Sequence, residues 1–236
     1  GTTLVDTEVD GVLAELDRRM NWSGPFEKGE GTVKRGRGIA VGFKASISPT
    51  TSMAIVNVNA DGSVIVHCST TDMGQGSDTV MAQIAAEVLG VGVDKVIVIH
   101  PDTDVTPYDM STLGSRSTYH MGHAVRLAAT EARDKLAEMA KELGLPKGTN
   151  APVDELFRRK YGMQAGNVIG SGSFIPPYKP TDHDTGQSPE AAPYWMIGAT
   201  GIELSVDTET GHVTIERLIT VADLGTALTP EIVATQ

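Results

Sequence analysis

The hydrophobic pattern of the chain changes repeatedly between a helical and a strand period, which predicts a protein of mixed α and β structure. Across residues 5–22, apolar side chains recur every three or four positions, as on one face of an amphipathic helix. Residues 53–59 and 63–67 instead alternate apolar with polar side chains around a short Ala-Asp-Gly turn, which predicts a β-hairpin. A second hairpin is predicted for residues 202–206 and 213–220.

The remaining elements follow from the same two periods. Helices are predicted where apolar residues keep helical spacing, over 76–89, 118–143 and 153–161. Strands are predicted over 38–47, 168–174 and 95–99, the last of them short and buried. Residues 179–193 are rich in Pro, Asp, Gly and Ser and predict a long surface loop. Because the elements lack a steady βαβ rhythm, we expect an α+β fold with mixed or antiparallel sheets packed with helices.

Composition limits the partners of the protein. The 236 residues carry a formal net charge of −11, which disfavours nucleic acid and anionic membranes as ligands. A site for an anion must therefore be local, built from backbone amides and one or two arginines. The single cysteine, Cys68, excludes an intrachain disulfide and a cysteine-based zinc or iron–sulfur site. With no membrane-span or signal-peptide pattern in the sequence, we expect a cytoplasmic protein.

Two glycine-containing junctions between a loop and a helix are the most informative local feature. Residues 73–79 precede one predicted helix, and residues 112–118 precede the longest one. Unpaired amides and the positive end of the helix dipole make such a junction a seat for an anion. Two of them, about 40 residues apart, predict a ligand with several negative or hydrogen-bonding groups.

At the first junction, Gly74 and Gly76 would let the backbone approach a ligand closely. Gln75 offers an amide that suits the edge of a heterocycle or a phosphate. Ser77 is placed to cap the following helix. The alternative is a plain turn between a strand and a helix, with Ser77 as its cap, and the local sequence leaves both open.

The second junction places an arginine among hydroxyl residues at a helix start. A positive side chain is unfavourable near the N-terminus of a helix, so we expect Arg116 to help hold an anion. The alternative is an arginine that points into solvent.

Other polar residues have a simpler interpretation beside a functional one. His120 and His123 could share a metal, but two ordinary helix histidines are favoured. Asp102 and Asp104 could bind a cation, but turn formers are favoured, with Asp109 bonding to nearby backbone. Cys68 is interpreted as a small buried residue.

The order of these segments resembles the molybdenum-binding subunit of the molybdenum hydroxylases, the xanthine dehydrogenase and aldehyde oxidase family. The likeness covers about residues 36–236. It depends on the segments at 38–40, 61–64, 73–76, 83–85, 89–91, 102–104, 112–118, 122–125, 206–207, 210–211 and 223–228. The resemblance implies an N-terminal helix and linker over 1–35 and a molybdopterin-binding domain over 36–236, with two lobes at 36–145 and 146–236.

The resemblance also implies a cofactor and its contacts. The family binds molybdenum through the dithiolene of a molybdopterin, often the cytosine dinucleotide form in bacteria, so no metal ligand is expected in the chain. Iron–sulfur and FAD groups are expected on other subunits or domains. Contacts to the cofactor carry over to Gly74, Gln75, Gly76, Gly114, Ser115, Arg116, Ser117 and Gln236.

The implied reaction is hydroxylation of a ring carbon next to nitrogen, or of an aldehyde carbon, with oxygen from water. The family's general base is a glutamate located after the segment that matches Gln236, and Gly29-Glu30 is not its counterpart. We therefore expect a C-terminally truncated fragment of a molybdenum oxidoreductase, without catalytic residues and inactive alone. The alternatives are a cofactor-free scaffold or subunit-interface fragment, and a different phosphate-binding enzyme, which would lack the Gly-Lys-Ser/Thr signature.

Overall fold

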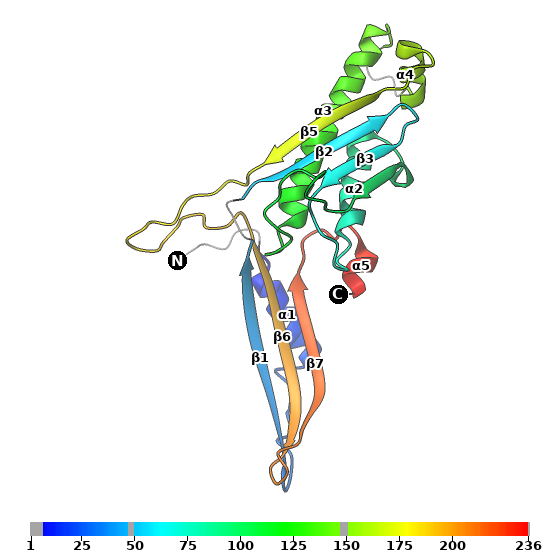
Figure 1. The fold of residues 1–236 in the computed structure, drawn as a ribbon. Coiled ribbons are helices and arrows are strands. Elements are labelled where there is room, and N and C mark those ends of the chain that lie inside the picture. Colours follow the sequence, from blue (N-terminus) through cyan, green and yellow to red (C-terminus); the bar gives the residue numbers. More distant parts are fainter. Residues whose placement is uncertain (1–6, 47–49, 147–150, 236) are drawn as a thin grey trace. The chain divides into compact units, whose positions relative to one another are not determined.

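The computed structural model describes residues 7–46, 50–146 and 151–235, and the chain divides into two compact units (Figure 1). The first unit combines Gly1–Ser46 with Lys179–Ala227, and the second combines Ile47–Tyr178 with Leu228–Gln236. Both contain sheets and helices, so the α+β class is confirmed. None of the helices within the described residues has the length and apolar content needed to cross a bilayer.

The first unit contains a three-stranded antiparallel sheet. Its strand order is β1 (Val33–Ala45), β6 (Trp195–Asp207) and β7 (Val213–Asp223). The hairpin of β6 and β7 confirms the second predicted hairpin, with longer strands. β1 begins before the predicted range of 38–47, because its pairing with β6 continues as far as the Val33–Asp207 pair.

The same pairing explains why the units differ from the expected lobes at 36–145 and 146–236. β1 lies early in the chain and β6 lies late, yet all 13 residues of β1 pair with β6. Most of the chain between them, Ile47–Tyr178, belongs to the second unit. Periodicity marks each strand but carries no information about which distant strand it pairs with, so the sequence could not show this division.

Helix α1 (Val9–Met20) forms the core of the first unit with the sheet. Its buried residues Leu16 and Met20 belong to the same hydrophobic cluster as Ile197 and Ala199 of β6. The helix ends at Asn21, which has a left-handed backbone with φ of 52°. The helix predicted over 5–22 is thus confirmed for its described part, and residues 5 and 6 lie outside the described residues.

The second unit contains a four-stranded mixed sheet in the order β4, β3, β2, β5. β2 (Ser52–Asn59) and β3 (Val64–Cys68) form the predicted hairpin. β5 (Asn167–Phe174) pairs antiparallel with β2, and β4 (Val96–Ile99) pairs parallel with β3. The strand predicted over 95–99 is confirmed, but its expected burial is wrong, because β4 is an edge strand and Ile97 is 57% exposed.

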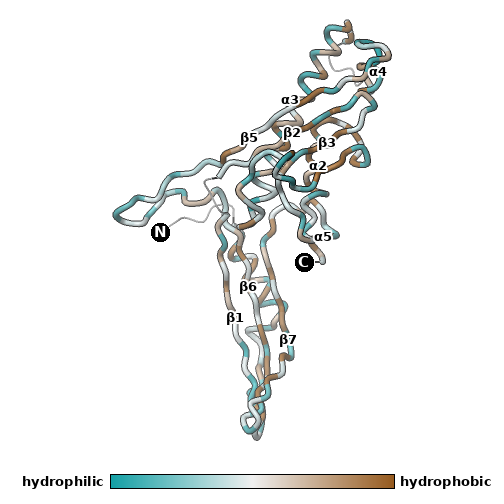
Figure 2. Tube along the Cα trace, in the orientation of Figure 1, coloured by the Kyte–Doolittle hydropathy of each residue, from teal (hydrophilic) through white to brown (hydrophobic). Residues whose placement is uncertain are grey.

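The predicted helices of the second unit are confirmed. α2 (Ser77–Leu89) and α3 (Gly122–Glu142) pack on the sheet, and α4 (Val153–Tyr161) packs against α3. A π-helical turn, η2 (Ser117–Met121), leads directly into α3. The short helices η1 (Val93–Lys95) and α5 (Pro230–Thr235) were not predicted, because each is too short for a clear period. Hydrophobic stretches of the tube lie along β3 and α2 (Figure 2).

Close contact between α3 and β5 holds the helix on the sheet. Gly170 and Gly172 of β5 lie directly under the α3 backbone, and a Cβ atom at either position would overlap a helix carbonyl oxygen. At Gly170 the overlap is with Ala128, and the amide nitrogen of Ala132 would also be only 2.7 Å away. The start of α3, which follows the second glycine-containing junction, is thereby fixed relative to the sheet.

We therefore expect Gly170→Ala to lower the free energy of unfolding by about 1–3 kcal/mol, the usual cost of overpacking against backbone. Gly166→Ala is the matched control, since its Cβ would meet Phe157 at an ordinary 3.4 Å and no strained backbone angle is required. That change should stay within about 0.5 kcal/mol of the unchanged protein. Denaturant unfolding measures both, and equal effects would contradict the close packing.

Candidate functional site

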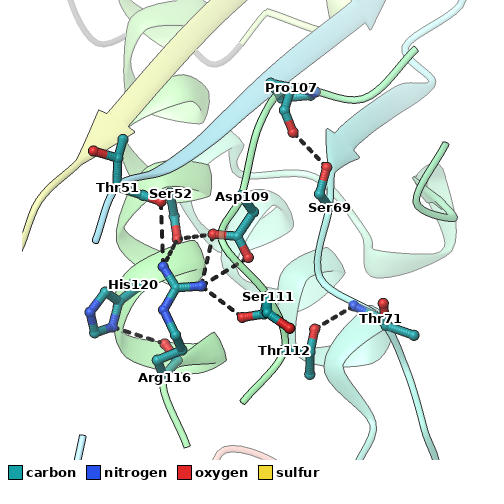
Figure 3. A network of polar contacts seen from close by, with 10 residues as sticks. All are labelled: Thr51, Ser52, Ser69, Thr71, Pro107, Asp109, Ser111, Thr112, Arg116 and His120. Atoms are coloured by element: carbon teal, nitrogen blue, oxygen red, sulfur yellow. Dashed lines mark hydrogen bonds and ion pairs between the residues drawn. The ribbon is translucent and has the colours of Figure 1, made fainter. Parts of the chain in front are cut away.

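The two glycine-containing junctions lie side by side in the second unit. We name residues 70–76 the first loop and residues 109–116 the second loop. The backbone N–H of Thr71 donates a hydrogen bond of 2.7 Å to the hydroxyl of Thr112 (Figure 3). Before the first loop, the Ser69 hydroxyl bonds to Thr106, at 2.9 Å, and to the Pro107 carbonyl. The two chain segments therefore form one continuous polar region.

The first loop is organised around the carboxylate of Asp72. This carboxylate accepts hydrogen bonds from the N–H groups of Gly74 (2.8 Å), Gly76 (3.3 Å) and Asp78 (3.2 Å). These bonds, chiefly the one from Gly74, lower the pKa of Asp72 below its usual 3.8. The expectation of bare amides at this junction is wrong, because the chain supplies its own anion. The role expected of Ser77 as the cap is also wrong, since Ser77 is the first residue of α2 and the N-cap position belongs to Gly76, which has no side chain.

The side chain of Gln75 forms hydrogen bonds to backbone groups of the same loop. Its side-chain oxygen accepts from the Met73 N–H at 2.6 Å, and its nitrogen donates to the Thr71 carbonyl at 2.8 Å. A longer bond of 3.2 Å reaches the Ser77 hydroxyl. The conformation also needs glycine on either side of Gln75, since Gly74 and Gly76 have φ angles of 103° and 77°. Gln75 thus fixes the shape of the surface that the loop presents.

The second loop is organised around the guanidinium of Arg116, which is only 1% exposed. Nη1 donates to both carboxylate oxygens of Asp109, at 2.8 and 2.9 Å, and to the Ser111 carbonyl at 2.8 Å. Nη2 donates to the Ser52 hydroxyl at 2.8 Å (Figure 3). The anion expected beside Arg116 is therefore Asp109 of the same chain, and the alternative of an arginine in solvent is wrong.

Asp109 and Ser52 were missed as partners of Arg116. Asp109 was interpreted as a turn residue that bonds to nearby backbone, whereas its buried carboxylate pairs with Arg116 and accepts from the Ser52 hydroxyl at 2.6 Å. An isolated β-bridge also joins Ser52 to Asp109. An arginine at a helix start signals that some anion is near. Nothing in the sequence identifies which carboxylate it is, and Ser52 is 64 positions from Arg116.

The backbone between these anchors is strained. Gly114 and Ser115 both have a left-handed conformation, with φ of 61° and 58°, and the Arg116 N–H bonds to the Leu113 carbonyl at 3.3 Å. A left-handed serine costs about 1–2 kcal/mol relative to an ordinary conformation. Strain of this kind and π-helical turns such as η2 are both enriched at ligand sites.

Other candidate residues are occupied in packing. His120 is fully buried with Nδ1 3.2 Å from the Arg116 carbonyl, and burial followed by the charge of Arg116 lowers its pKa. His123 stacks on Phe174 with ring centres 4.4 Å apart. Burial raises the pKa of the Cys68 thiol to about 11, in line with a small core residue. Within the described part of the chain, no three potential ligands gather to hold a metal ion.

The segment that precedes Gln236 reaches the first loop. A Cβ atom on Gly76 would overlap the side chain of Ile232 in α5, and the Thr229 hydroxyl lies 3.2 Å from the Gln83 side-chain oxygen in α2. Gln236 itself lies outside the described residues. A hollow of about 460 Å³ lies along the second half of α2, lined by Gln83, Ala86, Glu87, Gly90, Val91 and Val93. It includes none of the candidate residues.

Comparisons with known proteins converge on one kind of domain. A family model described as a molybdopterin cofactor-binding domain matches residues 12–236. A protein of Escherichia coli K12, named as a probable hypoxanthine oxidase, is 31% identical over 239 residues, which covers 94% of this chain and 23% of that protein. The aldehyde oxidoreductase of Megalodesulfovibrio gigas is 32% identical over 200 residues, covering 82% of this chain and 21% of that protein.

A solved structure agrees with these sequence matches. The crystal structure of the aldehyde oxidoreductase from Desulfovibrio desulfuricans superposes with a TM-score of 0.70 and 27% identity, over 94% of this chain and 23% of that one. The chain thus spans about a quarter of the length of the relatives it matches.

The capping role of Asp72 is testable by mutation and pH. We expect Asp72→Ala to lower the free energy of unfolding by about 1 kcal/mol near neutral pH, the usual effect of removing a helix cap. Because the folded pKa of Asp72 is lowered, this contribution is present above the ordinary value of 3.8 and is lost as pH falls through the folded pKa.

Chemical denaturation at several pH values should therefore show the difference between Asp72→Ala and the unchanged protein shrinking in acid. Asp104→Ala is the control, because Asp104 is exposed in a turn and its change should stay within about 0.5 kcal/mol. An Asp72 variant as stable as the Asp104 variant at neutral pH would contradict the cap.

Proposed function

The chain belongs to the molybdopterin cofactor-binding domain family, and from this premise we propose that its two loops jointly hold and orient the cofactor of a molybdenum hydroxylase. The observation that carries the proposal is the bond between Thr71 and Thr112, which joins the segments that precede the two helices. A single ligand can therefore contact both loops. Two separate loops on distant surfaces would not support one shared cofactor.

The charge and hydrogen-bonding groups of the two loops match different parts of such a ligand. Molybdopterin carries a phosphate and a pterin ring with many hydrogen-bonding groups. The first loop already holds the negative charge of Asp72, with Asp78 close by, so it suits a neutral ring better than a phosphate. We assign the ring edge to Gly74, Gln75 and Gly76.

The second loop suits the anionic part of the ligand. The charge of Asp109 is balanced there by Arg116. Ser115 and Ser117 carry hydroxyl groups, a chemical type that suits a phosphate. We assign the phosphate contacts to Gly114, Ser115 and Ser117. Arg116 is buried and engaged with Asp109, so we assign it an indirect role in place of direct contact. Gln236 is kept as a further proposed contact, because α5 lies against the first loop.

The bound cofactor supplies the redox chemistry of hydroxylation with water as the oxygen source. The residues of this chain contribute binding and orientation: Gln75 keeps the first loop in one shape, and the turn at Gly114 and Ser115 keeps the second. No glutamate of the chain matches the family's general base, so we propose that the 236 residues alone do not turn over substrate.

The wider setting is part of the same proposal. We propose the cytosine dinucleotide form of the cofactor, iron–sulfur and flavin groups on partner subunits or domains, contacts with the rest of the molybdenum subunit, and a cytoplasmic location. One relative is named as a probable hypoxanthine oxidase and another as an aldehyde oxidoreductase, so we propose a purine or an aldehyde as the substrate class. The net charge of −11 would repel nucleic acid and anionic membranes, so neither is proposed as a partner.

Cofactor content tests the proposal. In the assembled protein that carries this chain, we expect Gln75→Ala and Ser117→Ala each to weaken cofactor binding about fivefold, the effect of losing roughly 1 kcal/mol of hydrogen bonding, and thereby to lower the molybdenum per protein. Metal analysis and pterin fluorescence of the purified protein are the measurements. Gln164→Ala is the matched control, because Gln164 is exposed and precedes the end of β5 that pairs with Asn59, at the opposite end of β2 from Ser52.

Molybdenum content as high as in the wild-type protein, in both loop variants, would reject the assignment of these residues. A wild-type protein that contains neither molybdenum nor pterin would reject cofactor binding itself and would favour the scaffold alternative.

A further inference from the structure

We infer that Asp109, Arg116 and Ser52 act together as a clamp that positions the second loop, with Asp109 and Ser52 as positioning residues that never touch the ligand. The inference rests on the proposed function of that loop. It concerns the way in which the loop is held and gives Arg116 a role different from direct anion binding.

The first support is the connectivity of the guanidinium. Arg116 bonds to the Ser111 carbonyl, five residues earlier, so one side chain ties the beginning of the loop to its end. Its own carbonyl accepts the His120 N–H at 2.7 Å inside η2. The left-handed pair Gly114 and Ser115 lies between these two fixed points. The clamp therefore limits the conformations open to the strained turn.

The second support is the anchor to the sheet. Ser52 is the first residue of β2 and is fully buried. Its hydroxyl donates to Asp109 and accepts from Arg116, so its donor and one acceptor site are both used. This arrangement places the loop relative to β2, and α3 is placed relative to the same sheet by its contact with Gly170 and Gly172.

The third support is energetic. Arg116 and Asp109 have side chains that are 1% and 2% exposed, so the pair is removed from water. Desolvation of two charges offsets most of their attraction, and well-packed apolar residues in place of a buried ion pair are often equally or more stable. A need for stability alone therefore gives little reason to keep this pair. A need for one defined geometry explains the pair better, because the planar guanidinium directs Nη1 to Asp109 and Nη2 to Ser52 at the same time.

Direct binding of a ligand anion by Arg116 is a poorer account of the same residue. Nη1 already has three acceptors and Nη2 bonds to Ser52. Nε has no hydrogen-bond partner among the described residues, but it is buried and so offers a ligand no open donor. An approaching phosphate would have to displace Asp109 and would leave that carboxylate buried without its partner, which is strongly unfavourable.

The test separates positioning from simple stabilisation with an apolar pair. In the assembled protein, the double variant Arg116→Met with Asp109→Leu should keep its midpoint of thermal unfolding within about 4 °C. Its molybdenum content should nevertheless fall about fivefold or more, because the loop is no longer held in the binding conformation. The control is Arg158→Met with Asp154→Leu, an exposed ion pair on α4 that should change neither quantity.

The possible results distinguish a positioning role of the clamp from a merely stabilising one. A double variant with normal molybdenum content would overturn the clamp. If the double variant fails to fold, Arg116→Lys decides, because lysine keeps the charge but lacks the two nitrogens that reach Asp109 and Ser52 together. The clamp requires a folded Arg116→Lys protein with reduced molybdenum, and normal content overturns it. The proposed function fails separately, when the Gln75 and Ser117 variants keep full occupancy or the unchanged protein holds no cofactor.

Discussion

The buried ion pair between Arg116 and Asp109 is the constraint on which the candidate site depends. Two charges that are almost fully removed from water must stay paired, because either one alone would be strongly destabilising. Pairing them fixes the end of the second loop, brings in Ser52 from the start of β2, and leaves the turn at Gly114 and Ser115 in its left-handed form. The η2 turn and α3 then begin from a defined point on the sheet.

The first loop follows the same principle with a different acidic residue. Asp72 accepts three backbone N–H groups at the start of α2, where an outside anion was expected. Each junction therefore has its positive potential satisfied by the chain before any ligand arrives. Loops whose shape is already set would lose less conformational freedom on binding a ligand. The difference in charge between the loops is the basis on which we propose that the ring contacts the first loop and the phosphate contacts the second.

Local structure could be predicted from the sequence, and long-range partners could not. The helical period across 118–143 and the alternation of β2 and β3 come from adjacent residues, so both were predicted correctly. The junctions themselves were visible because glycine and hydroxyl residues precede helices. The choice of Asp109 as the partner of Arg116 and the pairing of β1 with β6 depend on tertiary structure. No local pattern encodes either.

The central claim is that one molybdopterin contacts both loops. Hydrogen–deuterium exchange tests it most directly, on protein isolated with the cofactor and on protein made in cells that lack molybdopterin synthesis. The account predicts slower exchange in peptides covering both 71–79 and 110–118 when the cofactor is present, with β7 of the first unit as an internal reference. Protection of only one loop, or of neither, would contradict it.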